Sequence, residues 1–188
     1  MIYFIDNFLD KKLLDFITTD LVDFKEIDTG DKSFWIKETP EPFLQYVIKK
    51  LEFIEQRTIK SIISFFREAK QGQDNDWRIH NDSIINDQKP ERAIVLYLSS
   101  NNDNKLNGTA FWEHKTYGDT YKESNTEEFN RMLKEDANDI DKWKLKSIVG
   151  HKKNRLLSYP SNYFHSKYPN EFIKSRVVFV MFYYYENL

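Results

Sequence analysis

The sequence predicts a mainly β protein of the α+β class, with helices packed on a β-sandwich or barrel. Aromatic residues form 16% of the chain, including 15 Phe and 11 Tyr, and such bulky side chains favour pleated sheet surfaces. Two helical apolar patterns near the N-terminus are followed by a series of short apolar runs. A length of 188 residues fits one domain, so we expect a single domain over residues 1–188.

The first 60 residues are expected to form a helical support for the β region. Residues 10–22 carry an apolar stripe at helical spacing. A second helix is predicted over residues 42–57, where Pro42 suits the first helical turn. We expect the apolar faces of both helices to pack on one sheet.

Residues 61–185 are predicted to form the β core. The predicted strands are Ser61–Glu68, Trp77–Ser83, Ala93–Ser99, Thr109–Glu113, Arg155–Tyr159 and Arg176–Tyr185. The last of these has apolar residues at both alternating positions, which indicates a central strand that is buried on both faces.

Residues 117–146 interrupt the strand pattern with a polar, charged segment. An amphipathic stretch lies around residues 127–134, and Ser124 with Glu127 matches a capping box. We interpret the segment either as a helical insertion over one end of the barrel or as a solvated excursion of the chain.

Composition excludes several kinds of site and partner. The absence of cysteine rules out disulfides, thiolate metal sites and cysteine nucleophiles. A net charge of −2 argues against a nucleic-acid partner. The N-terminus lacks the pattern of a signal peptide, and no segment reaches the roughly 18 apolar residues of a membrane span. We therefore expect a soluble, cytoplasmic protein without a membrane partner, and the sequence leaves its oligomeric state open.

His80 and Asp82 are separated by one residue within a predicted strand. Residues i and i+2 of a strand face the same side, so the imidazole and the carboxylate would converge on one point. A second histidine from elsewhere in the chain would complete a facial site for a divalent metal. Taken alone, the pair is more typical of an exposed polar strand edge than of a metal site.

Arg176 and His165 are the candidates that could join this pair. Arg176 opens the buried C-terminal strand, where an unpaired guanidinium would cost several kcal/mol. Its planar fork suits a carboxylate, which is either that of a ligand or that of an intramolecular Asp or Glu, unless the head group reaches solvent. His165 follows a predicted strand and a turn at Pro160, and a short strand after the turn would carry it back towards the barrel interior.

The order of these residues resembles that of the iron(II)/2-oxoglutarate-dependent oxygenases. The His-x-Asp motif at 80–82, a long gap, His165, and then Arg176 at the start of an apolar strand are similar to the prolyl-hydroxylase-like branch and its small bacterial and phage members. The resemblance spans residues 61–185 and includes the segments Ala93–Leu98, Asn107–Phe111 and Asn154–Leu157. It implies a double-stranded β-helix, the jelly-roll or cupin-like barrel.

The resemblance also implies a set of site residues and co-substrates. His80, Asp82 and His165 would bind Fe(II). Arg176 would pair with the distal carboxylate of 2-oxoglutarate, Tyr97 would hydrogen-bond the same carboxylate, and O₂ would be the second co-substrate. The activity implied is that of a dioxygenase that hydroxylates a C–H bond, in a peptide prolyl side chain or in a small molecule.

The sequence departs from the pattern of that branch at three points. The spacing from His165 to Arg176 is slightly long, the second glycine of the Gly-led strand is Thr109, and Arg67 stands where a tyrosine is usual. These departures concern the binding of the co-substrate more than the binding of the metal.

Three further residues are candidates with less specific patterns. Arg78 shares strand parity with His80 and Asp82, so it either lines the substrate side or forms a salt bridge at the strand edge. His114 is expected either to contact the substrate at the mouth of the site or to have a surface or core role. His151 lies beside two lysines and is expected in a solvated loop.

Two other functions remain open at this point. A cupin-like metal enzyme that does not use 2-oxoglutarate would explain the three ligands but would give Arg176 no role. A non-catalytic β-sandwich that binds a protein or a sugar would make the histidines structural. A metal assay separates the binding module from both enzymes, and succinate formation separates the two enzymes from each other.

Overall fold

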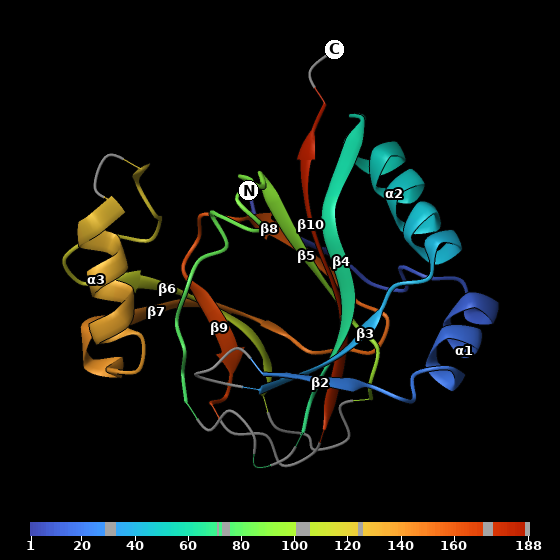
Figure 1. The fold of residues 1–188 in the computed structure, drawn as a ribbon, viewed down its shortest axis with the longest axis horizontal. Coiled ribbons are helices and arrows are strands. Elements are labelled where there is room, and N and C mark those ends of the chain that lie inside the picture. The colour runs from blue at the N-terminus through green and yellow to red at the C-terminus, as the bar shows by residue number, and fades with distance from the viewer. Residues whose placement is uncertain are drawn as a thin grey trace.

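Two antiparallel sheets form the body of the molecule (Figure 1). The structure is a computed structural model that describes residues 1–28, 33–70, 72, 76–100, 106–123, 126–170 and 175–186. One sheet has seven strands in the order β1-β8-β5-β10-β4-β3-β2, and the other has three in the order β7-β6-β9. Strands that lie far apart in the sequence are therefore neighbours in each sheet.

The elements have the following bounds. The helices are α1 (Lys11–Thr19), α2 (Glu41–Glu55), α3 (Thr126–Asp136) and the short 3₁₀ helix η2 (Ile140–Lys142). The strands are β1 (Tyr3–Ile5), β2 (Lys25–Asp28), β3 (Ser33–Glu38), β4 (Ile59–Ala69), β5 (Arg92–Tyr97), β6 (Gly108–His114), β7 (Trp143–Gly150), β8 (Leu156–Pro160), β9 (His165–Tyr168) and β10 (Arg176–Tyr185).

Strand β10 lies in the middle of the large sheet, between β4 and β5. One of its faces contributes Phe179, Met181 and Tyr183 to the core beneath the N-terminal helices. The other face contributes Val178 and Phe182 to the core between the two sheets. Burial on both faces confirms the prediction of a central C-terminal strand, which also has the predicted bounds.

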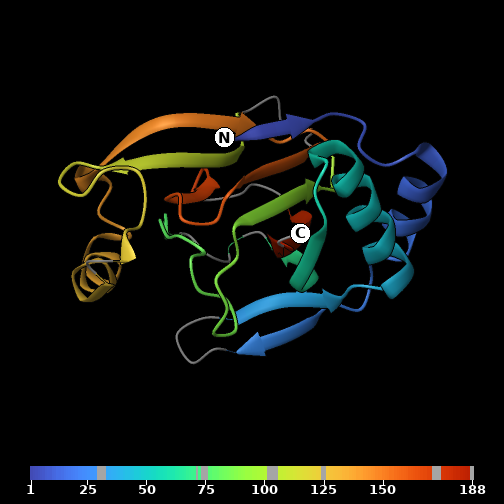
Figure 2. The same ribbon diagram turned by 90° about the horizontal axis from the view of Figure 1, so that it is seen from above.

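Helices α1 and α2 cover the outer face of the large sheet (Figures 1 and 2). Phe43 and Leu51 of α2 are buried there, and the Phe43 ring meets the Phe179 ring edge-on with 5.1 Å between centroids. Asp10 caps α1 by accepting a hydrogen bond of 2.9 Å from the backbone N–H of Leu13. The predicted packing of N-terminal helices on one sheet is therefore confirmed.

The first 60 residues also contain three strands that the sequence pattern did not reveal. Strand β1 pairs with β8, while β2 and β3 extend the large sheet beyond β4. The expectation of a purely helical support was wrong in this respect. Strand β2 is exposed at every position, so it shows none of the apolar alternation by which a half-buried strand is recognised.

Residues 77–83 do not form the regular strand that was predicted. Arg78 has a positive φ of 45°, which breaks the extended conformation, and only His80 makes a β-bridge, with His165. The segment is instead held by single backbone contacts, among them the Ile79 N–H to Ala137 O at 3.0 Å.

Helix α3 lies within the predicted insertion and packs on the outer face of the small sheet (Figure 1). Its buried residues Phe129 and Met132 share a core with Trp112 of β6 and with Phe164. The last residues of the 117–146 segment belong to strand β7 and not to a helix. Ser124, the predicted capping residue, lies outside the described residues.

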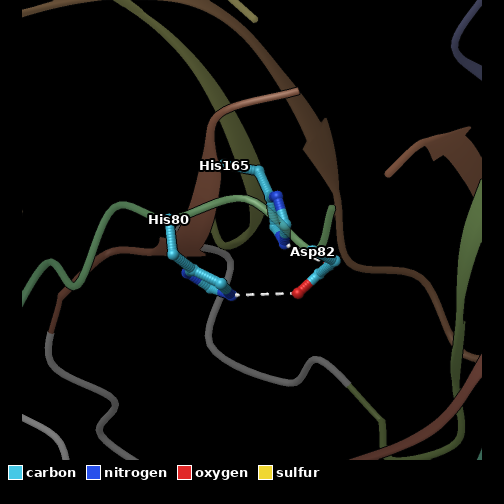
Figure 3. A group of neighbouring side chains, drawn as sticks. All are labelled: His80, Asp82 and His165. Atoms are coloured by element: carbon cyan, nitrogen blue, oxygen red, sulfur yellow. Dashed lines mark ion pairs between the residues drawn. The ribbon is translucent and has the colours of Figure 1, made fainter. Parts of the chain in front are cut away.

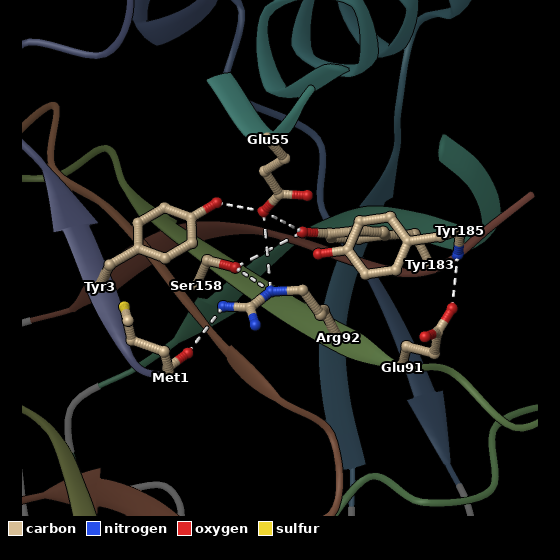
Figure 4. Close-up of polar contacts among 8 residues, drawn as sticks. All are labelled: Met1, Tyr3, Glu55, Glu91, Arg92, Ser158, Tyr183 and Tyr185. Carbon is tan, nitrogen blue, oxygen red and sulfur yellow. Dashed lines mark hydrogen bonds and ion pairs between the residues drawn. The ribbon is translucent and has the colours of Figure 1, made fainter. Parts of the chain in front are cut away.

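A buried polar network ties α2 to the outer face of the large sheet (Figure 4). The hydroxyls of Tyr3 and Tyr183 both donate to Oε1 of Glu55, the latter at 2.8 Å. Arg92 Nε lies 3.6 Å from the same oxygen and donates to Ser158 Oγ at 2.9 Å. These contacts link the N-terminal strand, the end of α2 and three strands of the large sheet.

None of the described helices has the length and apolarity that crossing a bilayer requires.

Candidate metal centre

A cavity of about 520 Å³ lies between the two sheets. Its apolar wall comes mainly from the inner face of the large sheet, with the residues Ile36, Ile63, Phe65, Val95, Val178, Val180 and Phe182. His80, Asp82, His165 and Arg176 all line this one cavity. The structure thus brings together the four residues on which the sequence argument rested.

The side chains of His80, Asp82 and His165 converge on one point (Figure 3). Asp82 Oδ1 lies 3.7 Å from Nε2 of His80, and Asp82 Oδ2 lies 3.2 Å from Nε2 of His165. The three potential ligand atoms all lie within 4.8 Å of one another. Asp82 and His165 are buried, whereas the His80 side chain is 41% exposed.

Backbone hydrogen bonds hold the three residues in place although they are far apart in the sequence. His80 and His165 exchange two bonds, with N–H to O distances of 3.0 and 2.8 Å. The Asp82 N–H donates to the carbonyl of Ser161 at 2.8 Å. The irregular segment 77–83 is therefore fixed against β9 and the turn before it at the positions that carry the ligands.

Nδ1 of each histidine is hydrogen-bonded to a backbone carbonyl oxygen. Nδ1 of His80 lies 2.7 Å from the carbonyl oxygen of Arg78, and Nδ1 of His165 lies 3.0 Å from that of Tyr163. A carbonyl oxygen can only accept, so each Nδ1 carries the hydrogen. In the neutral rings the lone pair is then on Nε2, the nitrogen that faces Asp82.

The surroundings also set the charge of each group. Desolvation of the His80 ring within the cavity, together with the nearby His165, lowers the pKa of His80 to about 4. Burial raises the pKa of Asp82, but the charge and hydrogen bond of His165 outweigh it, so the net shift is downwards. Burial lowers the pKa of His165, but Asp82 outweighs it and raises the pKa. The site thus offers an ionised carboxylate, one neutral imidazole, and a second imidazole whose Nε2 proton a cation would displace.

Tyr159 is a site residue that the sequence argument missed. Its hydroxyl lies 3.1 Å from Nε2 of His165, and its side chain lines the cavity. Burial and the charge of Asp82 raise its pKa well above the usual value, so it is a neutral hydrogen-bond donor. A signal was present, because Tyr159 and Leu157 alternate on one face of β8 and both enter the core between the sheets.

Arg176 lines the cavity from the start of β10 and is 9% exposed. Its Nη1 donates to the carbonyl of Gly108 at 2.8 Å, and its guanidinium carbon lies 5.0 Å from the centre of the Tyr97 ring. Burial lowers its pKa, but a guanidinium stays charged at any physiological pH. A fixed cation is thus held in the same cavity as the three potential ligands.

Tyr97 lies beside Arg176, behind the wall of the cavity. It is fully buried and is absent from the described residues that line the cavity. Its hydroxyl is hydrogen-bonded to Thr109 Oγ1 at 2.7 Å, and its ring lies 5.0 Å from the guanidinium carbon of Arg176. The hydrogen bond from Tyr97 to a co-substrate stays a prediction.

The two residues suggested for substrate contact have different positions. Arg78 lines the cavity, although its positive φ means that strand parity was the wrong reason to expect this. His114 is 3% exposed and lies beneath α3, outside the described lining of the cavity. Its Nε2 lies 3.1 Å from Asp136 Oδ2, and its ring stacks on Tyr117. His114 is therefore packed in the core beneath α3, which is one of the two roles expected for it, and its contact with a substrate stays untested.

His151 is buried, contrary to the expectation of a solvated loop residue. It is 8% exposed, and its Nε2 lies 2.8 Å from the carbonyl oxygen of Ser99. Its ring stacks on Tyr97 with 4.7 Å between centroids. His151 thus belongs to the packing behind Arg176, where the flanking lysines gave no indication of it.

The fold is the double-stranded β-helix of the iron(II)/2-oxoglutarate-dependent oxygenases, as the resemblance implied. The structure of HygX from Streptomyces hygroscopicus with nickel, 2-oxoglutarate and hygromycin B bound superimposes with a TM-score of 0.61 at 10% identity, covering 97% of this chain and 82% of that chain. A Pseudomonas putida prolyl-4-hydroxylase gives 0.60 at 13% identity, covering 99% and 93%. SnoK, a non-heme alpha ketoglutarate dependent carbocyclase from nogalamycin biosynthesis, gives 0.66 at 11% identity, covering 97% and 78%.

The chain belongs to the family of unknown function DUF6445, whose model matches residues 38–171. This range contains the three potential ligands and ends before Arg176. No curated protein sequence matches the chain.

Proposed function

We propose that this protein is a non-haem iron(II)- and 2-oxoglutarate-dependent dioxygenase that hydroxylates a C–H bond. One observation carries the proposal: two histidines are held with Nδ1 on backbone carbonyls, so that both Nε2 atoms face the carboxylate of Asp82. Two imidazoles and one carboxylate on one side of an ion form the donor set of non-haem iron(II) oxygenases.

The spacing of the donors fits an ion of this kind. Neighbouring ligands about 2.1 Å from an octahedral ion lie about 3 Å apart. The potential ligand atoms, one from each residue, lie within 4.8 Å of one another, so they would move closer together by up to about 2 Å around a bound ion. The partly exposed ring of His80 is the one with room to move, because Asp82 and His165 are buried.

Arg176 supports the use of a dicarboxylate co-substrate. A buried cation in the same cavity as the ligands can form a bidentate pair with a carboxylate. Gly108 and Tyr97 hold the guanidinium from behind, which reduces the cost of ordering it on binding. A metal enzyme without 2-oxoglutarate would leave this preorganised cation without a role.

The roles of the chain's own residues follow from their positions. Fe(II) with 2-oxoglutarate and O₂ would supply the oxidising chemistry. His80, Asp82 and His165 would hold the ion on one side and leave the other side to ligands. Tyr159 would donate a hydrogen bond at the ligand cluster. The apolar side chains of β4 and β10 would exclude water from the cavity.

The test is succinate formation by protein loaded anaerobically with Fe(II) and then given 2-oxoglutarate and air. We expect slow succinate formation without any added substrate, abolished in Asp82→Ala. Arg176→Met should keep the metal affinity and raise the 2-oxoglutarate concentration for half-maximal rate by at least tenfold. Metal binding without succinate would support the cupin-like alternative, and the absence of metal binding would support a non-catalytic module.

The class of substrate stays open between peptides and small molecules. Among proteins of this fold, HygX binds hygromycin B, and a prolyl hydroxylase from Trichoplax adhaerens binds a peptide fragment of hypoxia inducible factor. The fold therefore accommodates both classes, and the lining of this cavity has to distinguish them.

A further inference from the structure

Two arginines gather around one aromatic ring in the wall of the cavity. The guanidinium carbon of Arg67 lies 4.7 Å from the centre of the Phe34 ring, and that of Arg78 lies 4.5 Å from it. Arg67 comes from β4, Phe34 from β3, and Arg78 from the irregular segment before His80. All three residues line the cavity and are partly buried. The ring positions two cations together within the site.

The charges that line the cavity are strongly biased. Its described lining contains Arg67, Arg78, Lys167 and Arg176, and only one acidic residue, Asp82. Nζ of Lys167 lies 4.0 Å from Asp76 Oδ1 and donates to two backbone carbonyls, so this ammonium group already has partners in the wall of the cavity. Loading the site as proposed would bring Fe(II) and a 2-oxoglutarate dianion, which together with Asp82 and Arg176 carry no net charge. Arg67 and Arg78 add two further guanidiniums to this lining, besides the contacts that they already make.

The surface around these arginines is apolar. Ile27 of β2 and Ile36 of β3 line the cavity on the same side of the sheet as Phe34. Trp77, the residue before Arg78, lines it as well. Such walls favour a ligand with an apolar body, and a volume of about 520 Å³ is that of a cavity for a small organic molecule. 2-Oxoglutarate, with five carbons, would occupy only part of it.

From these observations, and resting on the proposed function, we infer that the substrate is a small organic molecule with an apolar body and one anionic group. Arg67 and Arg78 bind that group, which is a carboxylate or a phosphate. A guanidinium offers five N–H donors in a planar fork, so two of them can grip one anion from two directions while keeping other contacts. The apolar body then extends between Phe34, Trp77 and the metal centre.

Arg67 has a second candidate role, the binding of 2-oxoglutarate. The experiment has to distinguish this role from the binding of a substrate anion. It pairs with Val178 across β4 and β10, and Arg176 pairs with Ala69 two positions further along. Arg67 and Arg176 are thus diagonal neighbours on one face of the sheet, close enough for both to reach 2-oxoglutarate. Arg78 comes from a different element, so only a shared substrate anion would make both arginines behave alike.

The experiment uses protein loaded with Ni(II) and saturating 2-oxoglutarate, titrated calorimetrically with probe pairs that differ only in charge. Indole-3-acetate is compared with indole-3-acetamide, and phenyl phosphate with phenol, so that a carboxylate and a phosphate are tested separately. We expect the preferred acid to bind at least tenfold more tightly than its neutral partner. Arg67→Met and Arg78→Met should each remove most of this preference and leave the affinity for the neutral probe unchanged. Arg131→Met, an exposed change on α3, is the matched control and should bind like the wild type.

Three results would overturn the inference. Equal affinities for the acid and the neutral probe in the wild type would show that the cavity does not select an anion. An unchanged preference in both variants would place the anion site elsewhere. A loss of 2-oxoglutarate affinity in Arg67→Met, with no effect of Arg78→Met on the probes, would assign Arg67 to the co-substrate. The probe comparison is repeated without Ni(II) and 2-oxoglutarate. If Ni(II) or 2-oxoglutarate fails to bind, that result counts against the proposed function alone, because the preference for the acid probe is still measured.

Discussion

The hydroxyl of Tyr159 lies 3.1 Å from Nε2 of His165, the nitrogen that faces Asp82. The Asp82 carboxylate is near enough for its charge to raise the pKa of this hydroxyl. Once a cation occupies Nε2, the carboxylate is the remaining partner of the phenol. Partners of this kind orient the ligands of a metal and commonly change its affinity by about 10- to 100-fold.

Replacing Tyr159 by Phe should therefore weaken Ni(II) binding by about 10- to 100-fold while the fold is kept. The change removes one hydroxyl and leaves the ring, which packs edge-on against Phe111. Calorimetric titration with Ni(II) measures the effect. Tyr121→Phe is the control, because it also deletes a buried hydroxyl contact, with Thr126, but lies beneath α3. Equal Ni(II) affinities of the two variants would refute the role of Tyr159.

Gly108 is expected to be intolerant of any side chain. A Cβ at this position would lie 2.0 Å from the carbonyl oxygen of Val149, and the Gly108 carbonyl itself accepts the hydrogen bond from Arg176. Gly108→Ala should lower the free energy of unfolding by about 1–3 kcal/mol and weaken 2-oxoglutarate binding, because the arginine moves with its partner. Urea unfolding and calorimetry measure the two effects. Gly150→Ala, where the nearest atoms are 3.9 Å away, should change neither.

His151 should make the protein less stable as the pH falls. Burial, with the charge of Arg176, lowers its pKa from 6.5 to about 4 in the folded state. Between these values the unfolded chain binds a proton that the folded chain does not, so the stabilisation present above pH 6.5 is lost on acidification. The loss between pH 7 and pH 5 amounts to about 2 kcal/mol.

His151→Gln tests this pH dependence, since glutamine can still donate to the Ser99 carbonyl but does not titrate. Urea unfolding at pH 7 and pH 5 should show a drop in stability that is smaller in the variant than in the wild type. The difference isolates His151 from His80, whose pKa is also lowered to about 4. Identical drops in both proteins would mean that His151 is not the group responsible.

The network around Glu55 should stabilise the fold without affecting the metal centre. The Glu55 side chain is 7% exposed and that of Arg92 is 11% exposed, so removal of the carboxylate leaves a buried cation without its counter-charge. Glu55→Ala should lower the free energy of unfolding by about 3 kcal/mol. Ni(II) affinity should stay unchanged, because Tyr183 of the network faces the helices, whereas Val178 and Phe182 on the other face of β10 line the cavity. Glu41→Ala, an exposed change in the same helix, should have little effect on either quantity.

The sequence was sufficient for the features that depend on strong local patterns. The apolar run of β10 identified a central strand, and the strand and turn before His165 indicated that its side chain returns to the interior. The irregular segment around His80 could not be predicted, because its geometry comes from single hydrogen bonds to β9 and to Ala137. Local propensity carries no information about such distant partners.

The same limitation applies to the residues that were missed or misplaced. Tyr159 and Arg67 acquire their roles by facing the cavity from β8 and β4, which only the register of the sheet decides. His114 shows the converse case. A histidine at the end of an aromatic strand resembled a substrate contact, but Asp136 of α3 engages its ring outside the cavity. Contacts with distant parts of the chain, and not the residue type, decide whether each of these side chains faces the cavity.

His80, Asp82 and His165 are proposed to bind one divalent ion together. The most direct measurement is an anaerobic calorimetric titration with Ni(II) of the wild type, Asp82→Asn and Asp136→Asn. Among the described residues, Asp136 also contacts a buried histidine, His114, but without a second histidine beside it, so it is the matched control. We expect one ion per chain in the wild type and in Asp136→Asn, and at least 100-fold weaker binding in Asp82→Asn. Unchanged binding in Asp82→Asn, or no ion bound by the wild type, would contradict this proposal.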